Sequence, residues 1–203
     1  RLTTGSLTDA TGAVLADGMP EVEQFGRSTD HWVARIETLF GLQVGGWHGL
    51  AVADVTGDGL DDLYVPDGGG LPNRLLVQQP DGRVIDRSRG SGLDLLGHSH
   101  GALFGDFDND GDQDAAVTQP PGILFLTNDG TGRFTIAGSK LFPESVAYSL
   151  AAADYDQDGD LDLFVACYMQ QNRARRHSFV ARPVPYHDAN NGGRNELLRN
   201  EGG

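Results

Sequence analysis

Three nine-residue segments with the same spacing of acidic side chains constrain the fold of this chain more than any other feature. They are residues 54–62, 106–114 and 154–162, here called loops 1, 2 and 3, with positions numbered 1 to 9. Oxygen-bearing side chains occupy positions 1, 3, 5 and 9, and glycine occupies position 6. Glycine tolerates the left-handed backbone that lets a short loop turn back on itself. The spacing suits a hard cation, because calcium takes six to eight oxygen ligands at about 2.3–2.6 Å.

The predicted metal ligands are the side-chain oxygens at positions 1, 3, 5 and 9 and a backbone carbonyl at position 7. Loops 2 and 3 each place four carboxylates at positions 1, 3, 5 and 9, which repel one another unless a cation lies between them. Loop 1 has threonine at position 3, so we expect weaker affinity there, and two to three calcium ions in all. The candidate ligands are Asp54, Thr56, Asp58, Leu60 and Asp62 in loop 1, Asp106, Asp108, Asp110, Asp112 and Asp114 in loop 2, and Asp154, Asp156, Asp158, Asp160 and Asp162 in loop 3.

Two other interpretations of the loops need to be weighed. Aspartate, asparagine and glycine form turns without any metal, so a single loop of this kind would indicate only a turn. An EF-hand requires a bidentate glutamate at position 12, whereas position 12 here is Val65, Val117 or Val165, each within a predicted strand. Magnesium prefers to keep several of its waters. Three loops in register therefore favour calcium bound between strands.

An internal repeat surrounds the loops, whose first aspartates lie at residues 54, 106 and 154. Each loop follows one short apolar segment and precedes another, and in the first two repeats an Asp-Gly hairpin comes next. Four strands in about fifty residues, repeated, predict the blades of a β-propeller. The predicted strands are residues 50–53, 63–65, 75–77 and 84–85, then 102–105, 115–117, 123–126 and 134–136, then 150–153 and 163–166.

The predicted fold class is therefore all-β, a partial β-propeller of about three four-stranded blades with calcium loops. An N-terminal segment, residues 1–46, precedes it, either outside the blades or as part of an incomplete one. Residues 12–18 are predicted to form a hairpin or loop, and Asp30–Phe40 a short amphipathic helix. The predicted blades span about residues 47–96, 97–145 and 146–203. Because a propeller has at least four blades, the sequence indicates a piece of a larger propeller or a chain that another chain completes.

The loop pattern D-x-D-x-D-G-x-x-D between apolar strands resembles the FG-GAP, or VCBS, repeat of integrin-type and related bacterial propellers over residues 47–203. More narrowly, residues 49–58, 101–110 and 191–200 are similar to the cartilage acidic protein-like group, whose members often precede an ASPIC/UnbV segment. Thr56 departs from the acidic pattern, and these residues include no ASPIC/UnbV segment. The resemblance implies an extracellular, cell-surface or periplasmic propeller that uses calcium for its structure and serves in binding. It implies no reaction.

Composition narrows the function classes further. The net charge of −14 argues against a nucleic-acid partner, because phosphate binding needs a positive surface. No run of 18 apolar residues is present to span a membrane, and Cys167, the single cysteine, permits no internal disulfide. No G-x-S-x-G or phosphate-loop motif is found. We therefore predict a non-enzymatic binding or scaffold subunit whose partners are proteins or further propeller blades. The alternatives are a lectin-like carbohydrate-binding propeller and an accessory domain of a secreted enzyme.

Two further groups of residues are candidate sites. His48, His100 and Tyr148 each lie six residues before the first aspartate of their loop, near the strand expected to line a central channel. Together with His98 they either bind a transition metal or ligand near the axis, or are hydrogen-bonded and inert. An insertion in the third repeat, about residues 169–193, carries the predicted partner-binding residues Arg173, Arg175, Arg176 and Arg182. These arginines either bind an acidic protein or glycan or neutralise the protein's own acidic surface.

Overall fold

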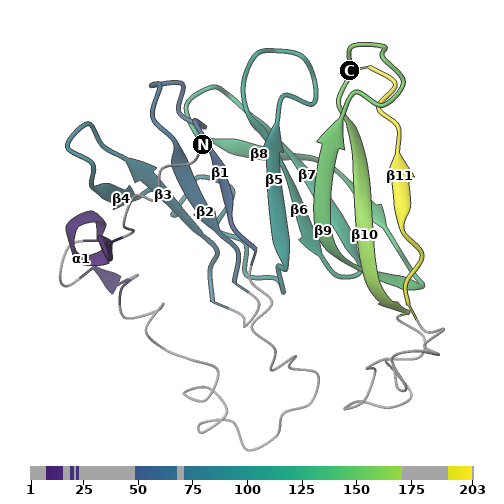
Figure 1. Ribbon diagram of the computed structural model, residues 1–203, viewed down its shortest axis with the longest axis horizontal. Helices are drawn as coiled ribbons and strands as arrows, with labels where there is room; N and C mark the ends of the chain where they lie inside the picture. Colours follow the sequence, from purple (N-terminus) through teal and green to yellow (C-terminus); the bar gives the residue numbers. More distant parts are fainter. Residues whose placement is uncertain are drawn as a thin grey trace, which may run out of the picture.

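The computed structural model describes residues 8–15, 19–20, 22, 49–67, 71–170 and 192–202. Its strands form three antiparallel sheets that stand side by side (Figure 1). This nearly all-β architecture confirms the predicted fold class. Sheet 1 contains β1 (Ala51–Ala53), β2 (Asp62–Val65), β3 (Arg74–Gln78) and β4 (Val84–Asp86); sheet 2 contains β5 (Gly101–Gly105), β6 (Asp114–Gln119), β7 (Gly122–Asn128) and β8 (Phe134–Leu141); sheet 3 contains β9 (Ser145–Ala153), β10 (Asp162–Gln170) and β11 (Glu196–Leu198).

Within each sheet, strands that follow one another in the chain also lie next to one another. Loop 1 joins β1 to β2, loop 2 joins β5 to β6, and loop 3 joins β9 to β10. The predicted Asp-Gly hairpins join the third and fourth strands of sheets 1 and 2, with Gly82 and Gly130 at φ 83° and 75°. Because the three sheets share this order, the acidic loops lie at the same end of the molecule, at the top of Figure 1.

The hydrophobic core lies between the sheets, in two layers. Ala115 and Val117 of β6 belong to the layer shared with sheet 1, together with Tyr64 and Leu75. Ala116, between them in sequence, belongs to the layer shared with sheet 3. Successive side chains of a strand point to opposite faces of a sheet, so β6 is buried on both faces. Its alanines are the small side chains that let three sheets pack closely.

The sheets converge along their first strands. An added Cβ on Gly101 would lie 2.9 Å from the carbonyl oxygen of Tyr148, and one on Gly49 would lie 3.0 Å from the Cα of Gly101. The amide of Gly49 donates to the carbonyl of His100 at 2.8 Å. Contacts this close leave no room for a side chain. The three sheets therefore approach each other as propeller blades approach an axis.

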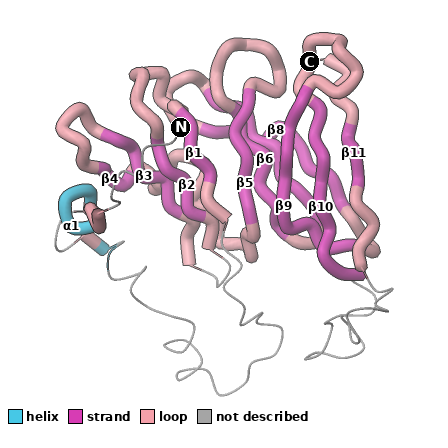
Figure 2. The backbone as a smooth tube through the Cα atoms, in the orientation of Figure 1, coloured by secondary structure: helices cyan, strands magenta, loops and turns pink. Residues whose placement is uncertain are grey.

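The N-terminal part differs from the sequence prediction. Thr11–Val14 form a short α-helix, α1, so the hairpin or loop predicted over residues 12–18 is wrong where the structure describes it. The amides of Val14 and Leu15 donate to the carbonyls of Ala10 and Thr11. Helix α1 lies beside sheet 1 (Figure 2), and Val14 lines an apolar cavity of about 510 Å³ with residues of that sheet. The predicted helix at Asp30–Phe40 lies outside the described residues.

The third repeat also departs from the other two. Its β10 continues to Gln170, so the first residues of the predicted insertion extend this strand. The described part of sheet 3 has three strands, in the order β11-β10-β9. The remainder of the insertion, with its arginines, lies outside the described residues.

A buried polar network joins sheet 1 to the segment between β4 and β5. The Asn73 Oδ1 accepts from the amide of Asp67 at 2.7 Å, and its Nδ2 donates to the Tyr64 hydroxyl at 2.6 Å and to the Ser99 Oγ at 2.9 Å. The Tyr64 hydroxyl donates to the carbonyl of Leu93 at 3.1 Å. Asn195 is the equivalent residue in sheet 3, where its Oδ1 accepts from the amide of Cys167 at 2.9 Å.

This network yields a test of the packing. We expect Asn73→Ala to lower the free energy of unfolding by about 2–4 kcal/mol, because each buried polar group left unpaired costs about 1–3 kcal/mol. Asn195→Ala, which removes an exposed side chain, is expected to cost about 1 kcal/mol or less. Urea denaturation of both variants measures the difference, and equal costs would contradict the account.

Candidate metal sites in the acidic loops

The aspartate at position 1 curls each loop. One oxygen of Asp54, Asp106 and Asp154 accepts from the position 5 amide at 3.1 Å in every loop. The other oxygen accepts from the amide of the position 6 glycine at 2.7, 3.1 and 3.2 Å. The glycines have φ values of 85°, 96° and 98°, the left-handed backbone expected from the sequence. The three loops therefore share one conformation.

The aspartate at position 9 is buried at the base of each loop. One of its oxygens accepts from the amide at position 2, at 3.2, 3.1 and 2.9 Å in Asp62, Asp114 and Asp162. Its other oxygen accepts from an amide of the third strand or its end, that of Gln78, Asn128 or Asn200, at 2.9 Å in all three. Each position 9 carboxylate thus fastens the loop to two neighbouring stretches of backbone.

Loops 2 and 3 bring three carboxylates together. Oxygens of Asp106, Asp108 and Asp114 all lie within 4.8 Å of one another, and so do oxygens of the equivalent Asp154, Asp156 and Asp162. These are positions 1, 3 and 9 of the predicted ligand set. Hard oxygen donors at this spacing fit calcium. Position 5 lies outside the two groups; Oδ1 of Asp110 and of Asp158 instead accepts from the amide of position 7, at Asp112 and Asp160.

Loop 1 offers fewer charges, as its sequence indicates. Asp54, Asp58 and Asp62 form no group of three carboxylates of this kind among the described residues. At position 3, the hydroxyl oxygen of Thr56 is buried and has no hydrogen-bond partner in the described part of the chain. Leu60 at position 7 has only its backbone carbonyl to offer. An unsatisfied buried oxygen is costly, and a cation in loop 1 would satisfy it.

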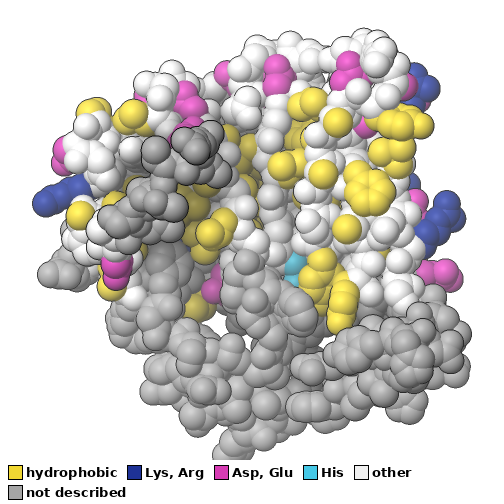
Figure 3. Space-filling model, in the orientation of Figure 1, with side chains coloured by type: hydrophobic (Ala, Val, Ile, Leu, Met, Phe, Trp, Pro, Cys, Tyr) yellow, Lys and Arg dark blue, Asp and Glu magenta, His cyan; other side chains and the backbone are white. Residues whose placement is uncertain are grey.

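Electrostatics in the loops also favours a cation. Burial raises the pKa of the Asp62 and Asp114 carboxyls, although two amides donate to each of them. Desolvation, followed by the carboxylates of Asp110 and Asp106, raises the pKa of Asp112. Figure 3 shows the acidic side chains gathered along the edge where the loops lie. A bound cation stabilises the ionised form of nearby carboxylates and so opposes both effects.

Two asparagines that the sequence interpretation missed connect loops 1 and 2 to the sheets that follow them. The Nδ2 of Asn128 donates to the carbonyl of Val55, at position 2 of loop 1, at 2.8 Å. The Nδ2 of Asn200 donates to the carbonyl of Phe107, at position 2 of loop 2, at 2.7 Å. A signal was present, because each asparagine stands two residues before a turn glycine, Gly130 or Gly202.

The other candidate residues are placed as follows. His100 is buried, with its ring centroid 4.3 Å from that of Tyr148 and 4.8 Å from that of His98. Within the described residues, neither histidine joins a group of three side chains that could hold a metal. His48 and the four arginines of the insertion, Arg173, Arg175, Arg176 and Arg182, lie outside the described residues.

Comparison with known proteins supports the resemblance found in the sequence. The FG-GAP-like repeat family matches residues 106–165, which contain loops 2 and 3. Cartilage acidic protein 1 of Xenopus tropicalis is 31% identical over 125 residues, 59% of this chain and 19% of that protein. Integrin alpha-PS2 of Drosophila melanogaster is 31% identical over 116 residues, 53% of this chain and 8% of that protein. The resemblance to FG-GAP repeats and to the cartilage acidic protein group is thereby confirmed.

A lectin is among the solved structures that are similar to this chain. It is an Agrocybe aegerita lectin described as recognising non-reducing terminal N-acetylglucosamine, with 18% identity and a TM-score of 0.39, covering 77% of this chain and 39% of the lectin chain. This chain spans less than a fifth of the length of the relatives named above, at 19% and 8%. No helix in the described residues is long and apolar enough to cross a membrane.

The raised pKa of Asp114 sets the direction of a pH effect on the metal-free protein. An unfolded aspartate titrates near pH 3.9. Because the folded pKa is higher, Asp114 contributes stability below that pH and loses it as the pH rises through the folded pKa. In calcium-free buffer we expect the wild type to lose stability relative to Asp114→Asn as the pH is raised from about 4. Urea denaturation across a pH series measures this difference, and a relative gain with pH would contradict it.

Proposed function

We propose that this chain is a calcium-stapled β-propeller module with a non-enzymatic binding or scaffold role in an extracellular, cell-surface or periplasmic setting. The observation that carries the proposal is the repetition of one donor set. Asp106, Asp108 and Asp114 are grouped within 4.8 Å, and the same three positions are grouped in loop 3. The same loop conformation at equivalent sites of successive sheets indicates a part of the repeat rather than a chance acidic cluster.

The chain's own residues define how such a staple works. In loop 2 the position 1 and position 3 carboxylates come from the start of the loop after β5, and Asp114 begins β6. Asp114 also accepts from the amide of Asn128 at the end of β7. Calcium, when bound, would supply the positive charge that offsets carboxylate repulsion. Binding there would therefore stabilise three strands of one sheet together.

The relatives support the setting and the class of function. Cartilage acidic protein 1 and integrin alpha chains are the named relatives, which favours a binding or scaffold protein outside the cell over an enzyme. Loop contacts between sheets add a structural reason. Because Asn128 and Asn200 bind the loop of the preceding sheet, calcium bound in one loop would also stabilise the interface with the next sheet.

We place the partner surface on the outer face of sheet 3. Across β10 and β11, Phe164 pairs with Leu197, at 45% and 48% exposure. The equivalent pair in sheet 1, Tyr64 and Leu75, is buried against sheet 2. Tyr155, at position 2 of loop 3, is 70% exposed. Figure 3 shows hydrophobic side chains exposed over these strands.

A further blade of the same kind is the partner that fits this face. At both described interfaces, the following sheet covers the cross-strand pair and donates an asparagine amide to the position 2 carbonyl of the acidic loop. Sheet 3 presents the same pattern through Phe164, Leu197 and the carbonyl of Tyr155. A blade with small apolar side chains and an asparagine or glutamine at the end of its third strand would continue the existing register.

Calcium dependence tests the main proposal. We expect about 10 mM calcium to raise Tm over chelated protein by about 5–10 °C for each occupied site. This takes a Kd of roughly 10⁻⁴ M, about 2.7 kcal/mol per site, and about 2–4 °C per kcal/mol. Asp108→Asn and Asp156→Asn should each lose part of this rise, because each removes one grouped carboxylate. Scanning calorimetry with and without chelator provides the measurement.

Asp61→Asn is the matched control for these variants. Asp61 is an exposed aspartate at position 8 of loop 1, outside the predicted ligand set, and its replacement changes the net charge equally. It should keep the full calcium response. Equal melting of the wild type with and without chelator, together with no bound metal by native mass spectrometry, would refute the proposal.

The exposure of the outer face of sheet 3 has its own matched test. We expect Leu75→Ala to lower the free energy of unfolding by about 2–5 kcal/mol, the usual cost of truncating a buried leucine. Leu197→Ala, the same substitution at the equivalent exposed site, should cost about 1 kcal/mol or less in the isolated chain. Chemical denaturation measures both. A large cost at Leu197 would mean that this face is already covered in the isolated chain.

A further inference from the structure

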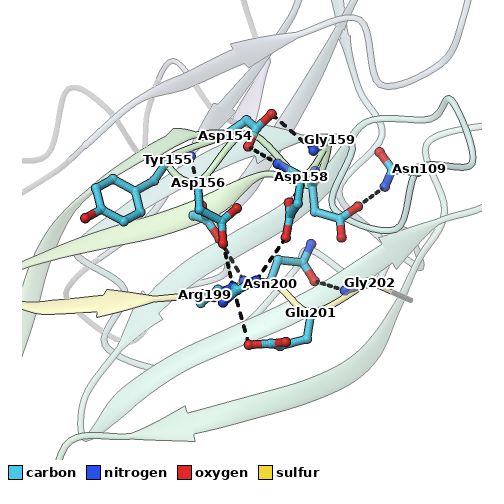
Figure 4. Close-up of polar contacts among 12 residues, drawn as sticks. Asn109, Asp154, Tyr155, Asp156, Asp158, Gly159, Arg199, Asn200, Glu201 and Gly202 are labelled. Carbon is cyan, nitrogen blue, oxygen red and sulfur yellow. Dashed lines mark hydrogen bonds and ion pairs between the residues drawn. The ribbon is translucent and has the colours of Figure 1, made fainter.

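An arginine from the segment after β11 pairs with the carboxylates of loop 3. The Nε of Arg199 lies 2.6 Å from an oxygen of Asp156, and its Nη2 lies 3.4 Å from an oxygen of Asp158. These carboxylates stand at positions 3 and 5, two of the predicted ligand positions. Glu201 also faces the guanidinium, with its carboxylate 3.4 Å from Nε. Figure 4 shows Arg199 between the two loop aspartates and Glu201.

This arrangement is confined to one of the three loops. Arg199 stands one residue before Asn200, whose amide donates to the position 9 carboxylate. The residues one position before the equivalent Gln78 and Asn128 are Val77 and Thr127, which carry no charge. Between described residues, no ion pair reaches an acidic side chain of loop 1 or loop 2. Loops 2 and 3 therefore have the same carboxylates but different electrostatic surroundings.

We propose that Arg199 is an internal counter-cation that competes with calcium for the carboxylates of loop 3. The proposal rests on the calcium binding proposed above. A guanidinium hydrogen-bonded to a carboxylate reduces the charge available to a metal and occupies its oxygens. Calcium entering the loop must therefore displace Arg199 from Asp156. Since about half of the Arg199 side chain is exposed, the arginine has room to turn toward solvent.

Two consequences follow for the module. Loop 3 keeps part of its charge neutralised when calcium is scarce, so sheet 3 depends less on the metal than sheet 2 does. Loop 3 also takes calcium at a higher concentration than loop 2, which makes metal loading stepwise. Tyr155 of loop 3 and Leu197, two residues before Arg199, are both exposed on the outer face of sheet 3. The metal content of loop 3 therefore bears on the surface proposed to receive a partner blade.

A reporter specific to loop 3 is present in the sequence. Position 2 is tyrosine in loop 3, Tyr155, whereas it is Val55 in loop 1 and Phe107 in loop 2. Terbium replaces calcium at oxygen sites and luminesces when a nearby tyrosine transfers energy to it. The luminescence that disappears in Tyr155→Phe therefore belongs to loop 3, and calcium competition against that signal gives the affinity of loop 3.

We expect Arg199→Gln to tighten calcium binding in loop 3 by about two- to five-fold, the range that a partly exposed ion pair can supply. Arg194→Gln is the matched control, because it removes the same charge from an exposed arginine whose partner is Glu196 rather than a loop aspartate. The calcium affinity of loop 3 in Arg194→Gln should stay near that of the wild type. The calcium affinity of loop 3 in Arg199→Lys should lie between those of the wild type and Arg199→Gln, since lysine keeps the charge but loses the planar fork of donors.

The outcomes separate this inference from the proposed function. Equal loop 3 affinities in the wild type and Arg199→Gln, or equal tightening in Arg194→Gln, would overturn the role of Arg199 and leave calcium binding intact. If no Tyr155-dependent signal arises in any variant, while native mass spectrometry shows no metal bound, both proposals fail. A second readout is thermal: Arg199→Gln should lower Tm in chelator more than Arg194→Gln, and the difference should shrink or reverse in saturating calcium.

Discussion

The buried aspartate at position 9 is the interaction on which the rest of this structure depends. Its carboxylate stands at the junction of the acidic loop, the second strand and the end of the third strand, and receives a backbone amide from two of these in all three sheets. A carboxylate removed from water needs compensation, and two donated hydrogen bonds supply part of it. In loops 2 and 3 the carboxylates at positions 1 and 3 lie close to this aspartate, and their negative charges also need compensation.

The loops also connect one sheet to the next. The side-chain amides of Asn128 and Asn200 donate to the backbone carbonyl at position 2 of the preceding loop. That carbonyl lies one residue after the aspartate that curls the loop. Loop conformation and sheet-to-sheet packing are therefore coupled through a few adjacent backbone groups, and the proposed metal binding would be coupled to both. On this account the calcium sites are structural, and recognition belongs to the surfaces that the sheets present, the outer face of sheet 3 among them.

Local patterns in the sequence predict much of the strand arrangement. They predict few of the contacts between residues that are far apart in the chain. The alternation of apolar segments, acidic loops and Asp-Gly turns places the strands of sheets 1 and 2 correctly, because each signal acts over a few residues. Helix α1 differs from the loop or hairpin predicted there because its hydrogen bonds and its packing on sheet 1 outweigh the turn tendency of Gly12. The role of Arg199 is not predictable from local sequence for a different reason. Its partners lie about forty residues earlier, and only the pairing of β11 with β10 brings them together.

The central claim is that the acidic loops hold metal ions between strands. The most direct measurement is anomalous difference density from crystals grown in calcium. The account predicts one peak within the carboxylates of Asp106, Asp108 and Asp114 and a second at the same positions of loop 3. In loop 3, Arg199 should turn away from Asp156. Density showing both loops free of metal at saturating calcium, with Arg199 still paired to Asp156, would contradict it.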